Sequence, residues 1–241
     1  MSRRDNIQWN TIAIESVAIV ISILLAFAID AWWADHQDRK SEVKLLQSLR
    51  TEFAANLEVI PRHIGYEQDS FNAAQAMIDS IREALPDDTF LAPDYLIVAS
   101  TVHGSFDAVS GIYDAAQQSG DIRLIENMEL RENLATWPGL VQDAVENQQI
   151  KRTIWGPKLL SEMMLQVDMS EVRRVIESCG YGQLESCASQ DFTMQPSLEL
   201  LGMLTEIRDW SREATAELEQ TRKFAEKTVA LIDSELERLG N

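Results

Sequence analysis

The stretch IAIESVAIVISILLAFAIDAWW, residues 12–33, decides the architecture of this chain. Residues 16–29 within it carry no charge, and apolar side chains occur on all sides of a helix drawn through them rather than in one stripe. Trp9 and Trp32 lie 23 positions apart, which in a helix is about 34 Å. That span matches the ~30 Å hydrocarbon core of a bilayer, whose two faces favour tryptophan. We therefore expect residues 11–33 to cross a membrane rather than to form a buried core helix.

A cleaved signal peptide is the closest alternative for this stretch. Ala26-Phe27-Ala28 resembles the small-residue site at which a signal peptidase cuts. Against cleavage, Glu15 interrupts the start of the apolar region, and residues 29–33 continue without Gly or Pro. An uncleaved anchor fits better, with a short segment of residues 1–10 before it and a body of residues 34–241 after it.

One face of the predicted transmembrane helix is small and polar. Side chains spaced by three or four residues fall within about 120° of one another on this face, and they are Glu15, Ala18, Ser22, Ala26 and Asp30. Such rows let helices approach closely in lipid, so we expect this face to pack against a second copy or another membrane protein. Alternatively, Glu15 takes up a proton or reaches the interface, and the small residues are ordinary filler. Trp9, Trp32 and Trp33 are the expected interface anchors.

Two features of the sequence bear on the side of the membrane on which the body lies, and only the second favours one side. The basic residues near the span are nearly balanced between its ends and do not decide the orientation; they are Arg3, Arg4, Arg39, Lys40 and Lys44. Cys179 and Cys187 flank two glycines, a spacing that allows a disulfide in an oxidising compartment. We therefore favour a protein of the bacterial inner membrane with a cytoplasmic N-terminus and a periplasmic body.

Other interpretations of the two cysteines stay open. Spacing alone does not bring their Cα atoms within bonding distance, so both thiols are unpaired if the body is cytosolic. A zinc site is disfavoured because His36, His63 and His103 are remote from the cysteines and form no ligand-spaced cluster. We expect no metal and no other cofactor.

The remaining sequence predicts an all-α body. The chain is 45% hydrophobic with only 10 Gly and 6 Pro, which is typical of packed helices. Apolar residues at helical spacing from Val43 to Ile81 predict that the anchor continues as a long amphipathic helix, kinked at Pro61. Asn127 is a helix start, and residues 198–239 predict a long final helix. We expect an antiparallel bundle, whose heptad-like rows form its own core rather than an intermolecular coiled coil.

Charge and motifs exclude several classes of function. The formal charge is 21 minus 39, or −18, which repels phosphate backbones and disfavours nucleic acid as a partner. The chain has no G-x-S-x-G, H-E-x-x-H, G-x-x-x-x-G-K-[ST] or G-x-G-x-x-G motif. We expect no enzyme, unless a site is assembled from scattered residues.

The most compact polar cluster in the body lies at a predicted helix junction. Ser119-Gly120 is a helix stop, and Asp121 follows directly. A possible binding cleft here would be shaped by Ser119, Gly120, Asp121, Arg123 and Arg131. Alternatively, Ser119 and Gly120 only end a helix and the two arginines are ordinary surface residues, so that no ligand is needed to explain the cluster. No ligand class follows from the sequence.

Three groups of residues resemble an uncharacterised family of bacterial single-span membrane proteins, known mainly as a domain of unknown function. They span roughly the first 135 residues: the run from Glu15 through Leu24-Leu25-Ala26 to Ile29-Asp30-Ala31-Trp32; then Leu45-Leu46, Leu49, Glu52-Phe53 and Asn56-Leu57; then Ser119-Gly120-Asp121, Leu124-Ile125 and Leu130-Arg131. Similar proteins often carry Gly at Ser22 and Asn-x-Trp at Asp30-Ala31-Trp32. The resemblance implies an anchored helical domain outside the cytoplasm and brings no catalytic residues.

These observations favour a membrane-anchored interaction or scaffold protein that oligomerises or joins an envelope complex. A periplasmic ligand-sensing domain is the alternative. Because only about ten residues precede the predicted span, such a sensor would signal through a separate partner.

Overall fold

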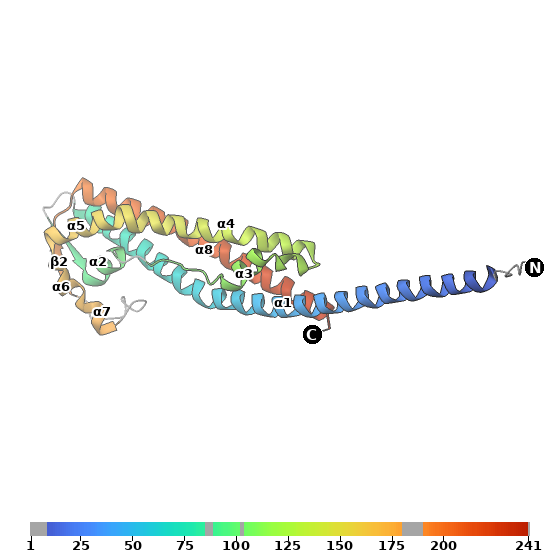
Figure 1. Ribbon diagram of the computed structural model, residues 1–241. Helices are drawn as coiled ribbons and strands as arrows, with labels where there is room; N and C mark the ends of the chain where they lie inside the picture. The colour runs from blue at the N-terminus through green and yellow to red at the C-terminus, as the bar shows by residue number, and fades with distance from the viewer. Residues whose placement is uncertain (1–8, 85–88, 102–103, 180–189, 241) are drawn as a thin grey trace, which may run out of the picture.

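The computed structural model describes residues 9–84, 89–101, 104–179 and 190–240, with side chains from Glu15 onward in the first helix (Figure 1). Three long helical segments build the body: α1 (Trp9–Ala84), the chain of α4 (Met128–Ile150), the π-helix η2 (Lys151–Trp155) and α5 (Gly156–Gln166), and α8 (Leu198–Arg238). The predicted all-α fold, in which an N-terminal helix continues into a long-helix bundle, is confirmed.

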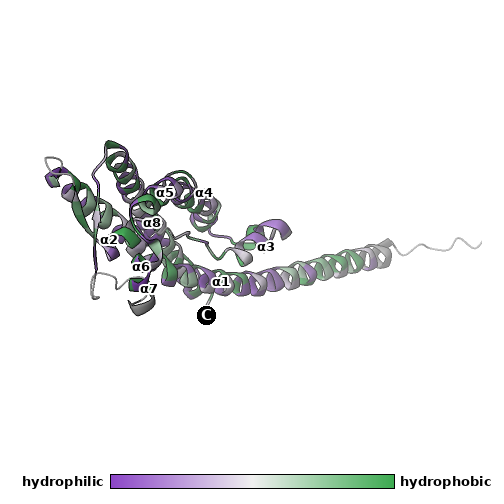
Figure 2. Cartoon of the chain, turned by 90° about the vertical axis from the view of Figure 1, so that its left-hand side faces the viewer, coloured by the Kyte–Doolittle hydropathy of each residue, from purple (hydrophilic) through white to green (hydrophobic). Residues whose placement is uncertain are grey.

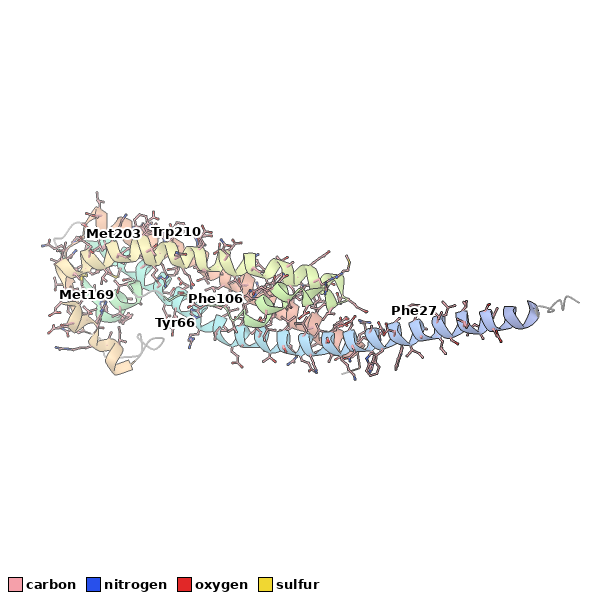
Figure 3. The ribbon with its side chains drawn as sticks, in the orientation of Figure 1. Phe27, Tyr66, Phe106, Met169, Met203 and Trp210 are labelled. Carbon is pink, nitrogen blue, oxygen red and sulfur yellow. The ribbon has the colours of Figure 1, made fainter. Side chains whose placement is uncertain are left out.

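Helix α1 joins the predicted anchor, residues 11–33, to the body without a break. It has 76 residues, a length of about 114 Å, and it continues through Pro61. Its N-terminal part extends beyond the body (Figure 1), and apolar residues, drawn in green, dominate it toward its free end (Figure 2). The described apolar side chains there are exposed, including Phe27 at 67% (Figure 3). By length and composition this part is a candidate membrane span.

Helix α8 runs antiparallel to α1 along the whole body and packs against it more extensively than any other element. It also packs against α4, so the three long helices share one core. Near the end of α8, Arg50 of α1 pairs with Asp233, with 2.5 Å between Nε and Oδ1. The C-terminal end of the chain therefore lies beside α1 where that helix leaves the body (Figure 1).

The core consists of three apolar clusters that follow one another along the bundle. The cluster nearest the anchor contains Phe53 and Trp137, whose ring centroids lie 4.8 Å apart. A small middle cluster contains Ile60, Ile64 and Phe106. The largest cluster lies at the far end and joins α1, α2, α5 and α8. The apolar periodicity of α1 thus predicts its buried face correctly.

The end of the body farthest from the anchor carries a small sheet and short helices. Pro93 predicts a helix that ends near residue 102, but the sequence did not reveal the other elements. Strand β1 (Phe90–Pro93) pairs antiparallel with β2 (Asp191–Met194). Short helices α2 (Asp94–Thr101), α6 (Met169–Val172) and α7 (Arg174–Cys179) pack nearby. The two strands have four residues each, too few to show a period of two in the sequence.

The connection from α2 to α4 contains α3 (Gly111–Ser119) and the 3-10 helix η1 (Asp121–Leu124). Gly120 ends α3 with φ of 81°, a left-handed conformation that glycine adopts without strain. The Asn127 side chain caps α4 by accepting the Leu130 N–H at 3.0 Å. The predicted stop and start are both confirmed. The sequence predicts a helical segment from about Phe106 to Gln118, but residues 104–110 have no regular secondary structure and α3 begins only at Gly111.

Candidate functional site

The connection that precedes α3 is held against α1 by side chains of that helix. We call residues 105–113, which run from this connection into the first turn of α3, the strap. The buried Asn56 of α1 donates from Nδ2 to the Val109 carbonyl and accepts the Val109 N–H at Oδ1, both at 2.8 Å. This two-way pairing satisfies the backbone of Val109 as a neighbouring strand would.

Glu52 fixes the far end of the strap, where α3 begins. Its two carboxylate oxygens accept the N–H groups of Ile112 at 2.5 Å and Tyr113 at 3.0 Å. Burial raises the pKa of Glu52, and the two backbone hydrogen bonds oppose that rise. A carboxylate at this position caps the first turn of α3 and interacts favourably with the helix dipole.

A buried polar network links the start of the strap to all three long helices. The Phe106 N–H donates to Gln148 Oε1 at 2.8 Å, and Gln148 Nε2 donates to Glu67 Oε1 at 3.0 Å. Lys151 Nζ donates to Glu67 Oε2 and, at 3.1 Å, to Ser211 Oγ. Ser211 donates in turn to Ser70 Oγ at 3.1 Å. We call Glu67, Ser70, Gln148, Lys151 and Ser211 the buried network.

Lys151 is the residue at which α4 becomes the π-helix η2. The wider turn of a π-helix changes the direction of the side chains that follow it. Burial lowers the pKa of Lys151, whereas the adjacent Glu67 carboxylate acts in the opposite direction. A lysine beside a serine can activate a nucleophile, but Ser211 is 0% exposed and Lys151 is also bonded to a carboxylate. Both side chains are closed to solvent, and their contacts join the three long helices.

The strap, α3 and α4 enclose a groove of 520 Å³, which we call the acidic groove. Aromatic and aliphatic side chains form its floor, and the carboxylates of Asp107, Asp114 and Glu146 surround them. Among the described residues that line it, none is Lys, Arg or His. The lining residues are Phe106, Asp107, Ala108, Ser110, Tyr113, Asp114, Trp137, Pro138, Val141, Gln142, Val145, Glu146 and Gln149.

A second cavity, of 710 Å³, lies between α5 and α8 at the end of the body far from the anchor. Leu165 and Leu198 on its edge are 83% and 80% exposed. Lys158 Nζ lies 4.6 Å from the ring centroid of Trp155, which also lines this cavity. Its walls carry both acidic and basic groups, so charge selects no class of ligand there.

The predicted cleft residues form the turn between α3 and α4. Ser119 Oγ donates to Asp121 Oδ2 at 2.7 Å, and Gly120 carries the left-handed turn. Arg123 is exposed, and Arg131 lies one turn into α4. None of these five residues lines the acidic groove. Helix termination accounts for the contacts that they make.

The predicted transmembrane face is present on α1 and is exposed along its length. It comprises Glu15, Ala18, Ser22, Ala26 and Asp30. Ser22 Oγ donates to the Ala18 carbonyl of the same helix at 2.8 Å. At the end of the candidate span, the Trp32 ring stacks on His36 with centroids 5.8 Å apart, and Trp33 lies beside both. Trp9 begins α1, but its side chain lies outside the described residues.

The predicted disulfide also lies outside the described residues. Cys179 is the last residue of α7, and neither its side chain nor Cys187 is described. Within the described ranges, no group of three or more His, Cys, Asp and Glu side chains is placed to hold a metal ion.

The sequence contains a signal for the buried network that we did not use. Ile60 and Ile64 occupy the buried face of α1, and Glu67 takes the next position at helical spacing, where an apolar residue is expected. A carboxylate there needs a buried partner. Nothing in the local pattern, however, identifies Lys151 as that partner.

Comparisons with protein-family models, curated proteins and solved structures found no match to this chain.

Proposed function

We propose that this chain is a membrane-anchored interaction protein that associates with other membrane proteins through one face of its transmembrane helix. The observation that carries the proposal is the continuity of α1. A bare apolar segment and the central helix of the body are one element. Whatever binds the anchor therefore fixes the position of the body.

The exposure of the anchor supports its place in lipid. Val20, Leu24 and Phe27 are 54%, 61% and 67% exposed, and each would be costly to leave in water. A bilayer covers such side chains on all sides, whereas the small face leaves room for a second helix. Because Ser22 donates to its own helix, its hydroxyl costs little to bury in that contact.

We further propose that the protein lies in a bacterial inner membrane with its body in the periplasm. The cysteine spacing and the resemblance to single-span bacterial proteins support this orientation. Protease treatment of spheroplasts, with a C-terminal tag and a cytosolic marker, tests it. Loss of the tag with an intact marker is expected, and a protected tag would place the body in the cytoplasm.

Disulfide crosslinking tests the association. In a chain with serine at both native cysteine positions, Ser22→Cys is expected to crosslink to a neighbouring copy, while Leu24→Cys, on the opposite face, is not. Glu15→Leu and Ser22→Leu are expected to reduce the oligomers or co-purifying membrane proteins.

Ala28→Leu is the matched control for Ser22→Leu because it adds similar bulk on the other side of the helix. If Glu15→Leu and Ser22→Leu leave both crosslinked oligomers and partners unchanged, the proposed contact face is wrong. If Ala28→Leu is as disruptive as Ser22→Leu, association does not depend on this face.

A ligand-sensing domain that signals through a partner is the second candidate. It is favoured because one wall of the acidic groove is the strap. Two side chains of α1, Asn56 and Glu52, hold the strap by hydrogen bonds to its backbone. A ligand in the groove would then change the crosslinking yield at position 22. An unchanged yield with the groove occupied would contradict sensing through α1.

A further inference from the structure

We propose that the acidic groove binds a small organic cation that carries an apolar body. This inference goes beyond the association of the anchor and does not depend on it. It rests on the shape of the groove, on the charge of its edge and on the way its walls are fixed.

The size and lining of the groove suit a small molecule. Its volume of 520 Å³ lies within the range of about 300 to 1,000 Å³ that is usual for ligand sites. Val141 and Val145, one helical turn apart on α4, are only partly buried and leave apolar surface in the groove. Phe106, Tyr113 and Trp137 close the floor below them and are almost fully buried. An apolar body placed there would lose contact with water on one side.

The edge of the groove selects a positive charge. Its three carboxylates come from three separate elements: Asp107 from the strap, Asp114 from α3 and Glu146 from α4. All three are exposed, and no salt bridge joins them to a basic side chain within the described parts of the chain. Their combined field attracts a cation and repels an anion.

Neighbouring acidic groups strengthen this field. Glu217 of α8 faces α4 and accepts a hydrogen bond from Asn147 Nδ2 at 2.7 Å. Burial raises the pKa of Glu217, and the negative charges of Asp143, Glu213 and Glu146 add to that rise. The surface between α4 and α8 next to the groove is therefore negative as well.

The walls of the groove are fixed before a ligand arrives. The strap is bound at Phe106 by Gln148, at Val109 by Asn56 and at Tyr113 by Glu52. Two of these three bonds lie in the buried interior, and the third is part-buried. A pre-formed site loses little conformational entropy when it binds a ligand.

Three probes that share one ring system test the charge and the apolar body separately. Calorimetric titration of the full chain in zwitterionic detergent would compare tryptamine, tryptophol and indole-3-acetate, which are cationic, neutral and anionic. Titration into detergent alone corrects for partition into micelles. We expect tryptamine to bind, tryptophol to bind roughly tenfold more weakly and indole-3-acetate to show no binding.

Variants locate the binding. Asp107→Asn with Glu146→Gln is expected to weaken tryptamine binding about tenfold, and Val145→Trp, which fills the groove, is expected to abolish it. Glu132→Gln is the control because it removes one exposed α4 carboxylate that neither lines the groove nor adds to the neighbouring acidic groups. Circular dichroism checks that each variant is folded.

The proposal is overturned if the folded protein does not bind tryptamine, or if it binds all three probes equally. It is also overturned if Glu132→Gln weakens binding as much as the double change does. Failure of crosslinking at position 22 would contradict the proposed association and leave this outcome unaffected, so the two tests fail separately.

Discussion

At the scale of single residues, the most unusual feature is a charged pair in the middle of a helical core. Lys151 and Glu67 are 1% and 0% exposed, and removing two charges from water costs several kcal/mol for each ion. The network offsets this cost because Gln148 and Ser211 satisfy further hydrogen-bonding atoms of the pair. Such pairs favour one arrangement of helices over others, since any shift leaves a charge without its partner.

Loss of one member of the pair should destabilise the body. Lys151→Met leaves Glu67 buried and uncompensated, so we expect the free energy of unfolding to fall by about 3–5 kcal/mol. Urea unfolding of the detergent-solubilised chain, followed by circular dichroism, measures this change. Lys223→Met, at an exposed position on α8, is the matched control and should change little.

The double change Lys151→Met with Glu67→Leu distinguishes charge from packing. It removes both ions and should recover most of the lost stability, because no charge stays buried. If the double variant is as unstable as Lys151→Met alone, the packing around the lysine stem matters more than the pair.

His63 should make the stability of the body depend on pH. Burial, followed by the positive charge of Arg62, lowers the pKa of His63 from 6.5. The unfolded chain then takes up a proton at higher pH than the folded chain does, so stability is lost as the pH falls from 6.5 through the lower folded value. Thermal unfolding at about pH 7.5 and about pH 5.5 should show a larger drop for wild type than for His63→Leu.

Comparing wild type with His63→Leu separates the contribution of His63 from that of the acidic groups whose pKa values are raised. The pKa values of Glu42, Glu52 and Glu217 are raised from 4.5, so these groups stabilise the body as the pH falls toward that value. Wild type and His63→Leu both contain these groups, so their effect on the pH dependence of stability is the same in the two proteins. Equal pH dependence in wild type and His63→Leu would show that His63 titrates alike in the folded and unfolded chains.

At the scale of elements, the long helices could be predicted from the sequence and the strap could not. Apolar residues recur along α1 and α8 over many turns, and Gly120 and Asn127 mark a stop and a start by local chemistry. The strap has no such pattern, because Asn56 and Glu52, which lie more than 50 positions earlier, satisfy its backbone. The acidic groove depends on the strap, so its position could not be predicted either.

Asn56 should control the order of the strap. In Asn56→Ala, the Val109 N–H and carbonyl both lose their partner, so we expect faster amide exchange in residues 105–113 by hydrogen–deuterium exchange. Asn56→Asp keeps an acceptor for the N–H but loses the donor, and it should fall between alanine and wild type. Gln47→Ala, an exposed change on α1, should leave exchange unchanged. Equal exchange in all four proteins would mean that other contacts hold the strap.

At the scale of the whole molecule, α1 sets how far each part of the body lies from the candidate membrane span. The body begins near Glu42, nine residues beyond Trp33, or about 14 Å along the helix. The far end near Ala84 is about 77 Å from Trp33. Because α8 returns along α1, its end lies beside α1 near the candidate span, whereas α5 and the small sheet lie at the opposite end of the body (Figure 1).

Energy transfer to labelled lipids measures these distances. In vesicles, with serine at both native cysteine positions, a donor dye at Glu237→Cys should transfer strongly to acceptor lipids, and one at Leu165→Cys should transfer weakly. Both sites are exposed, so labelling should not disturb the core. Equal transfer from the two positions would mean that the body lies flat on the bilayer instead of projecting from it.

The pairing of α1 with α8 also has a consequence for biosynthesis. The ribosome must add 154 more residues after Ala84 before Arg238 at the end of α8 exists, which takes about 8 to 30 s at usual rates of translation. Throughout that interval the apolar face of α1 beyond the anchor lacks its main partner. The nascent chain should therefore be most vulnerable to aggregation and proteolysis before release, and a chaperone that covers this face should raise the yield of folded protein.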